Sequence, residues 1–180
     1  VLCTNAANVT DEILEICKTN NVLISTSLDG PKFIHDSNRF LKKKSSYENV
    51  ISGINKYREH LGSDQVSALM TTTQLSLKHP KEIIDCYIEN NFTNIFLRPI
   101  SPYGFAIKTP KLNSYEIKDF IEFYKCGLEY IIDINRKGHF FVEDYTVILL
   151  RKMLTPFQNN YVDLMNPSAA GRSVLVYNYD

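Results

Sequence analysis

Apolar residues alternate between two spacings over the first hundred positions. Four short runs rich in β-branched and other apolar residues predict strands: 1–4, 22–28, 66–72 and 94–99. Between them, three segments with apolar residues three and four apart predict amphipathic helices: 10–20, 45–62 and 80–88. This β-α-β-α-β-α-β order is typical of parallel strands joined by helical crossovers, so the sequence predicts an α/β sheet or barrel.

Each predicted helix begins at a recognisable start signal. Thr10 precedes two acidic residues, Ser45 is followed three positions later by Glu48, and Pro80 suits the first position of a helix. A polar and basic segment follows Pro31 and reaches Ser45, and His35-Asp36 within it is compatible with a helix-start cap.

Beyond residue 100 the pattern changes. We expect a long loop over 100–113, a long helix capped by Ser114 and ended by Gly138, and a shorter helix over 144–154. The tail is predicted to be loop-like over 158–172 and a strand over 174–179. Because the chain opens and closes inside predicted strands, we expect it to be a fragment of a longer protein.

Charge and cysteine usage narrow the function classes. Twenty Lys and Arg balance twenty Asp and Glu, which argues against a dedicated nucleic-acid binder. No apolar run approaches the ~20 residues that span a bilayer, so we expect no membrane association. The four cysteines at 3, 17, 86 and 126 show neither metal-ligand spacing nor a disulfide framework, so we predict no metal site and a cytoplasmic protein.

Polar side chains gather toward the carboxyl ends of the predicted strands. Alternation places Ser25, Ser27 and Asp29 on one face of their strand, and Thr71 and Thr73 follow the same trend on the next strand. Because ligands bind at the carboxyl ends of parallel strands, this predicts a ligand site there. The alternative is that solvent alone makes these strand ends polar.

The stretch from Ile24 to Arg39 contains the most specific chemistry. The Ser27 hydroxyl suits a hydrogen bond to a ribose or a carboxylate, and the Arg39 guanidinium suits bidentate binding of a carboxylate. Asp29 is able to accept hydrogen bonds from hydroxyl groups. The alternatives are that Asp29-Gly30-Pro31 is simply a turn and that Arg39 is a solvated surface charge.

This stretch, S-x-S-L-D-G-P…H-D-x-N-R, resembles the fourth-strand region of radical SAM peptide-modifying enzymes. The branch it resembles carries an additional C-terminal cluster domain and includes the anaerobic sulfatase-maturating enzymes. Within that branch, the chain is most similar to the maturase of His-Xaa-Ser peptide systems. Asn5, the pair Arg98-Pro99 and the segment 168–180 are similar to further conserved regions of the family: the end of its third strand, the end of its sixth strand and the entry to its C-terminal domain.

The resemblance implies a partial (β/α)6 barrel, with strands three to six over residues 1–157 and the start of a C-terminal extension over 158–180. It implies S-adenosylmethionine and a 4Fe–4S cluster as cofactors of the parent protein, a 5′-deoxyadenosyl radical as its reactive species and a peptide or protein as its substrate. The implied cofactor-binding positions are Asn5, Ser27, Asp29, Arg39, Leu97 and Arg98. Ser27 and Arg39 would contact the methionine or ribose part, Leu97 the adenine, and Asp29 would position the turn or reach the ribose.

The chain also departs from that family. It lacks the C-x₃-C-x₂-C run that holds the cluster, and Ser168 stands where the family commonly has a cysteine. We therefore expect this polypeptide to bind no cluster or cofactor and to be inactive by itself, whereas the parent would be an oxidoreductase.

Two other function classes remain open. One is a different α/β-barrel enzyme acting on phosphate or sugar groups, although no glycine-rich phosphate loop is present. The other is a non-catalytic domain that recognises a peptide. An incomplete barrel would leave an open sheet edge, which predicts self-association.

Overall fold

A computed structural model describes residues 1–100, 115–157 and 161. The chain divides into two compact units, Val1–Glu143 and Asp144–Asp180. The first unit contains every strand of the described part. The second contains α8 (Asp144–Leu154), the shorter helix predicted after residue 143. The domain boundary expected after residue 157 stays a prediction.

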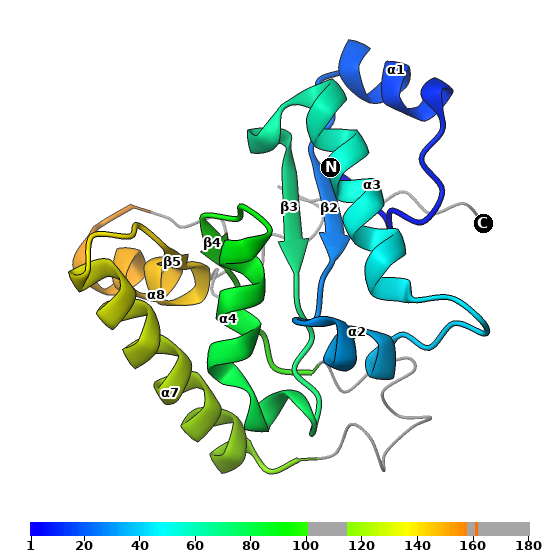
Figure 1. The fold of residues 1–180 in the computed structure, drawn as a ribbon. Coiled ribbons are helices and arrows are strands. Elements are labelled where there is room, and N and C mark those ends of the chain that lie inside the picture. The colour runs from blue at the N-terminus through cyan, green and yellow to red at the C-terminus, as the bar shows by residue number, and fades with distance from the viewer. Residues whose placement is uncertain (101–114, 158–160, 162–180) are drawn as a thin grey trace. The chain divides into compact units, whose positions relative to one another are not determined.

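The strands of the first unit run parallel, as predicted (Figure 1). Their bounds are β1 (Leu2–Cys3), β2 (Ile24–Ser27), β3 (Val66–Leu69), β4 (Asn94–Ile95) and β5 (Val142–Glu143). They form one sheet in the order β1-β2-β3 and a second sheet of β4 and β5. The backbone N–H and the hydroxyl of Thr72 both donate to the Arg98 carbonyl, at 3.2 and 2.7 Å, so the extended segments after β3 and β4 lie side by side.

The predicted helices of this region are confirmed: α1 (Asp11–Thr19), α3 (Ser46–Leu61), α4 (Pro80–Glu89) and α7 (Ile117–Arg136). Thr10 caps α1 by accepting from the Ile13 N–H at 3.3 Å, and Ser45 caps α3 by accepting from the Glu48 N–H at 3.1 Å. The Glu48 side chain pairs with Lys32 instead of returning to the cap. Short 3₁₀ turns, η1 (Ser63–Gln65) and η2 (Ser76–Lys78), precede β3 and α4.

Besides the two 3₁₀ turns, the sequence analysis missed two elements. The first is α2 (Lys32–Asn38), which follows Pro31 and contains His35 and Asp36 in its interior rather than starting at them. The second is the two-residue strand β5. Several other expectations fall wholly or mostly outside the described residues: the loop over 100–113, the Ser114 cap, the strand over 174–179 and the likeness at 168–180.

Burial along β2 and β3 follows the predicted alternation. Ile24, Thr26 and Leu28 are buried, whereas Ser25 and Ser27 are only partly so. In β3, Val66 and Ala68 are buried and the intervening residues are exposed. The buried face packs under the helices, so the sheet presents its more polar face at the other side, with its carboxyl ends near α2 (Figure 1).

Among the described residues, no helix is both long enough and apolar enough to cross a membrane. Among the described residues, β1 is an edge strand of its sheet, because it is hydrogen-bonded to β2 on one side only. Self-association through this edge stays a prediction.

Candidate functional site

The turn after β2 requires a glycine. Gly30 has φ of +124°, and a Cβ added there would lie 2.8 Å from Cγ1 of Ile83. From α4, the Tyr87 hydroxyl donates to the Leu28 carbonyl at 2.7 Å. Leu28 and Gly30, the two neighbours of Asp29 in the chain, therefore both contact α4, and these contacts fix the position of Asp29.

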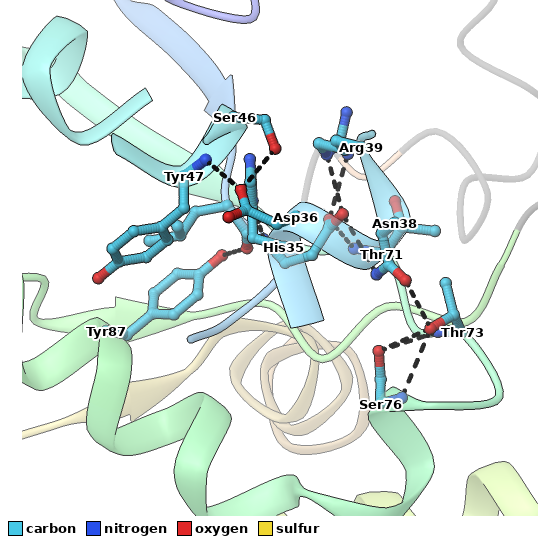
Figure 2. A network of polar contacts seen from close by, with 12 residues as sticks. His35, Asp36, Asn38, Arg39, Ser46, Tyr47, Thr71, Thr73, Ser76 and Tyr87 are labelled. Carbon is cyan, nitrogen blue, oxygen red and sulfur yellow. Dashed lines mark hydrogen bonds and ion pairs between the residues drawn. The ribbon is translucent and has the colours of Figure 1, made fainter. Parts of the chain in front are cut away.

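Asp29 and Arg39 form a bidentate ion pair. Nε and Nη2 of Arg39 donate to the two carboxylate oxygens at 2.8 and 3.1 Å. The Asp29 side chain is 2% exposed and that of Arg39 is 36% exposed. The Thr71 backbone N–H also donates to Asp29, at 3.1 Å, so this carboxylate joins the end of β2, the end of α2 and the segment after β3 (Figure 2).

His35 of α2 is buried behind the same turn. The Asp29 backbone N–H donates to its Nδ1 at 3.2 Å, and its ring meets the Tyr47 ring edge to face. Burial lowers the pKa of His35; the nearby Asp29 carboxylate opposes that shift and Arg39 adds to it. The ring is therefore held in its neutral form.

Asp36 ties α2 to the start of α3. Its carboxylate accepts from the Ser45 hydroxyl at 2.8 Å, the Ser46 hydroxyl at 2.9 Å and the Tyr47 N–H at 2.8 Å (Figure 2). Burial raises the pKa of Asp36, but these hydrogen bonds outweigh burial, and the net pKa is lowered. This contact explains why a seven-residue helix with little apolar periodicity is formed.

A cavity of about 490 Å³ opens at the carboxyl ends of β1 and β2. Of the six predicted site residues, the cavity brings together Asn5, Ser27 and Arg39. Its other described lining residues are Ala7, His35, Asn38, Phe40, Leu41, Ser46 and Asn49. The volume lies within the usual range for small-ligand sites, and the lining combines polar side chains with apolar ones.

The Asn5 segment reaches the cavity through a tight turn. The Ala7 N–H donates to the Asn5 side-chain oxygen at 3.1 Å, which leaves the Asn5 amide N–H groups available. Ala6, with φ of 52°, is buried against Gly53 of α3. A Cβ at Gly53 would lie 2.0 Å from the Ala6 carbonyl oxygen, so the absence of a side chain there sets the position of this segment.

The remaining predicted residues have different surroundings. Asp29 lies beneath Arg39, so its position favours a role in holding the turn. Leu97 is fully buried: its side chain reaches toward Gly127 of α7, and its backbone N–H donates to Glu143 at 3.1 Å. The Arg98 carbonyl is engaged by Thr72 and its side chain is exposed. Leu97 and Arg98 are not among the described residues that line this cavity.

Sequence reasoning missed His35 and Asn38 as individual site residues. Both line the cavity, and Asn38 also accepts from the Thr73 hydroxyl at 3.1 Å. His35, Asn38 and Arg39 are separated by three and four positions, the spacing that places residues on one helix face. That signal was present in the sequence, but it becomes meaningful only once α2 is known to be a helix.

A larger cavity, of about 990 Å³, lies along α7 and η2. Its lining contains three acidic residues, Glu116, Asp119 and Glu122, the polar side chains Gln74, Lys78 and Tyr115, and the less polar residues Leu77, Pro80, Phe123 and Cys126. The two cavities differ in the charge of their linings, because the smaller one contains Arg39 and no carboxylate among its described lining residues. A ligand that carries a carboxylate therefore matches the smaller cavity better.

The donor set can be compared with the two cofactors that the resemblance implies. The hydroxyl of Ser27, the amide of Asn5 and the guanidinium of Arg39 suit the carboxylate and ribose oxygens of S-adenosylmethionine. An iron–sulfur cluster does not fit the described residues, because no three His, Cys, Asp or Glu side chains in that part of the chain are grouped to hold a metal.

The lowered pKa values of His35 and Asp36 predict loss of stability in acid. Each group takes up its proton more readily in the unfolded chain, so its contribution is present above its unfolded pKa, 6.5 or 3.8, and is lost as the pH falls through its folded pKa. We expect the free energy of unfolding to decline as the pH falls below about 6.5, by at most about 1.4 kcal/mol per pH unit per proton, and to decline again as the pH falls below about 3.8.

Urea unfolding over this pH range measures the effect. His35→Asn is expected to remove the first decline and Asp36→Asn the second. A wild-type stability that stays constant from neutral pH to pH 5 would contradict the assignment for His35.

No family model matches the chain. In sequence, the chain is 31% identical over 98 residues to a serine-type anaerobic sulfatase-maturating enzyme of Bacteroides thetaiotaomicron, a match that covers 54% of this chain and 23% of that enzyme. It is also 31% identical over 99 residues to an uncharacterized protein of Methanothermobacter thermautotrophicus, covering 55% of this chain and 36% of that protein. The matches thus span about a quarter to a third of the length of these relatives.

Solved structures match the fold over a larger share of the chain. Native anSMEcpe with bound AdoMet aligns with a TM-score of 0.66 at 18% identity, covering 85% of this chain and 42% of that one. The same protein with bound AdoMet and the Kp18Cys peptide aligns with a TM-score of 0.65 at 18% identity, again covering 85% and 42%. The chain is therefore a homologue of a sulfatase-maturating enzyme and shares the fold of part of anSMEcpe, which confirms the resemblance drawn from the motif at residues 25–39.

Proposed function

We propose that this chain is the S-adenosylmethionine-binding part of a radical SAM enzyme that modifies a peptide or protein side chain. The observation that carries the proposal is the cavity at the ends of β1 and β2, which Asn5, Ser27 and Arg39 share. The fold likeness to a protein crystallised with AdoMet supports it.

The proposed roles follow from the contacts. Arg39, oriented by Asp29, directs its remaining N–H groups toward a carboxylate, while the Ser27 hydroxyl and the Asn5 amide bind the methionine or ribose part. Leu97 would lie near the adenine, and Arg98 would hold the segment after β3 beside the segment after β4 through its carbonyl. The described residues thus bind and orient the cofactor.

The chemistry itself would come from the bound cofactor, which in this family supplies a 5′-deoxyadenosyl radical when a 4Fe–4S cluster reduces it. We propose that other parts of a longer, cytoplasmic oxidoreductase hold that cluster. In that protein, residues 1–157 would contribute strands three to six of a partial (β/α)6 barrel, and residues 158–180 would begin a C-terminal domain. The chain alone would be inactive.

A peptide substrate is the second part of the proposal. Two of the structural neighbours were crystallised with peptides, Kp18Cys and Cp18Cys, together with AdoMet. We propose a peptide partner for the parent protein by this likeness, and a maturase of a His-Xaa-Ser system as the narrower assignment.

The coding sequence upstream of Val1 provides the first test. The proposal requires a C-x₃-C-x₂-C run there, and its absence would refute the proposal. The second test is equilibrium dialysis of S-adenosylmethionine against the anaerobically reconstituted parent protein. We expect Ser27→Ala and Arg39→Met each to weaken binding by about tenfold, which corresponds to a lost hydrogen bond or ion pair of about 1.4 kcal/mol.

Other outcomes would favour the other function classes. A parent that binds a phosphorylated ligand but not S-adenosylmethionine would indicate a different α/β-barrel enzyme. A parent that stays colourless after iron and sulfide reconstitution, and still binds a peptide, would indicate a recognition domain.

A further inference from the structure

His35 is a buried polar side chain to which the proposed function assigns no role. It is 1% exposed, yet it lines the same cavity as Ser27 and Arg39. A buried imidazole must have its hydrogen-bonding groups satisfied, so the partners of its two ring nitrogens define what it does.

One ring nitrogen is already engaged. Nδ1 accepts the Asp29 backbone N–H at 3.2 Å, so it carries no proton. In a neutral imidazole the proton then resides on Nε2, which becomes a donor. Burial favours this neutral form, and the charged groups nearest the ring, Asp29, Arg39 and Asp36, act on it in opposing directions.

Among the described residues, Nε2 has no hydrogen-bond acceptor. The hydrogen bond that the ring makes there is the one from the Asp29 N–H to Nδ1. Because the ring lines the cavity, an acceptor for Nε2–H is supplied most simply by a ligand there. The neighbouring polar groups, Ser27, Asn38 and Arg39, are also mainly donors or donor-capable, so the cavity is matched to a ligand rich in oxygen acceptors.

We propose that His35 is a ligand-binding residue of this cavity: its Nε2–H donates to an acceptor oxygen of the bound nucleotide, while its Nδ1 holds the turn at Asp29. This inference rests on the proposed function, because the ligand is taken to be S-adenosylmethionine. It adds a direct cofactor contact that the motif comparison did not assign.

Two variants separate the two nitrogens. His35→Asn keeps an acceptor near the Nδ1 position and removes the donor at Nε2. His35→Gln keeps an amide N–H near the Nε2 position and removes the acceptor for Asp29. We expect His35→Asn to weaken S-adenosylmethionine binding to the reconstituted parent protein by about five- to tenfold with little change in melting temperature. His35→Gln should bind within about threefold of wild type but melt at a lower temperature.

Equal binding by His35→Asn and wild type would overturn the inference while leaving the proposed function intact. Failure of the wild-type parent to bind S-adenosylmethionine would instead refute the proposed function. The assignment of the ring nitrogens is tested separately, without ligand, by ¹⁵N NMR of the histidine-labelled chain near neutral pH. We expect the His35 signals of an unprotonated Nδ1 and a protonated Nε2, and the reverse pattern or an imidazolium would overturn the inference.

Discussion

Arg39→Met is expected to lower the free energy of unfolding by about 2–4 kcal/mol, because it leaves the Asp29 carboxylate buried without its cation. The Asp29 side chain is 2% exposed, and it would retain only the hydrogen bonds from Thr71 and Asn38. Because the Arg39 side chain is itself 36% exposed, we place the effect toward the lower part of the range for fully buried pairs. Urea unfolding followed by circular dichroism measures it.

Arg136→Met is the matched control. Arg136 pairs with Asp133 at 3.3 Å, but the two side chains are 76% and 59% exposed, so the loss should stay within about 0.5 kcal/mol. Adding Asp29→Asn to Arg39→Met removes both charges and should recover at least about 1 kcal/mol. Equal stability of the Arg39 and Arg136 variants would show that the ion pair does not hold the turn.

Gly53→Ala is expected to destabilise the fold by about 1–3 kcal/mol, although alanine is the better helix former. The added Cβ would lie 2.0 Å from the Ala6 carbonyl oxygen and 2.8 Å from the Ala6 Cβ, so α3 and the segment after β1 must separate. Backbone atoms cannot move aside by a rotamer change, whereas the end of a flexible side chain can. The amide NMR signals of Asn5 and Ala7 should shift, since both residues line the cavity.

Gly127→Ala controls for the substitution itself. It lies inside α7, and its Cβ would meet the side-chain tips of Leu97 at 2.9 Å and Ile84 at 3.5 Å, which are able to move. The gain in helix propensity should offset most of that contact, giving a net change below about 1 kcal/mol. If Gly53→Ala and Gly127→Ala changed the free energy of unfolding equally, the Ala6 segment would not be packed directly against α3.

The elements that the sequence predicted are those whose stability is visible locally. The helices at α1, α3, α4 and α8 each combine an apolar stripe with a cap or a breaker, such as Thr10, Ser45 or Pro80. The parity of β2 was equally readable, because serines alternate with buried Ile24 and Leu28. In these segments the hydrophobic pattern and the terminal residues indicate the same structure.

The missed elements depend on contacts with residues outside their own segments. Helix α2 buries Ile34 and His35 and is held by the contacts of Asp36 with Ser45, Ser46 and Tyr47. The strand β5 is only two residues long, and buried Glu143 accepts from the Leu97 N–H at 3.1 Å. No local pattern encodes either contact.

The candidate site, like the fold, could be anticipated only in part from the sequence. Ser27 and Arg39 line one cavity, and strand parity accounts for the side of the sheet that Ser27 faces. Their role as cofactor-binding residues stays a prediction. The pairing of Arg39 with Asp29, and the burial of His35 beneath the same turn, arise from the way α2 folds back, which sequence spacing does not reveal.

The segment 39–47 is held at both of its ends, and this determines where the chain can accept inserted residues. Arg39 is fastened to Asp29, and Ser45 and Ser46 are fastened to Asp36, so the three lysines at 42–44 connect two points that are already fixed. Closing a longer flexible connection costs only about 0.6 kcal/mol for each doubling of its length. Residues 42–44, which are not among the described lining residues of the cavity, are therefore where a short peptide tag or an epitope could be inserted without breaking either set of contacts.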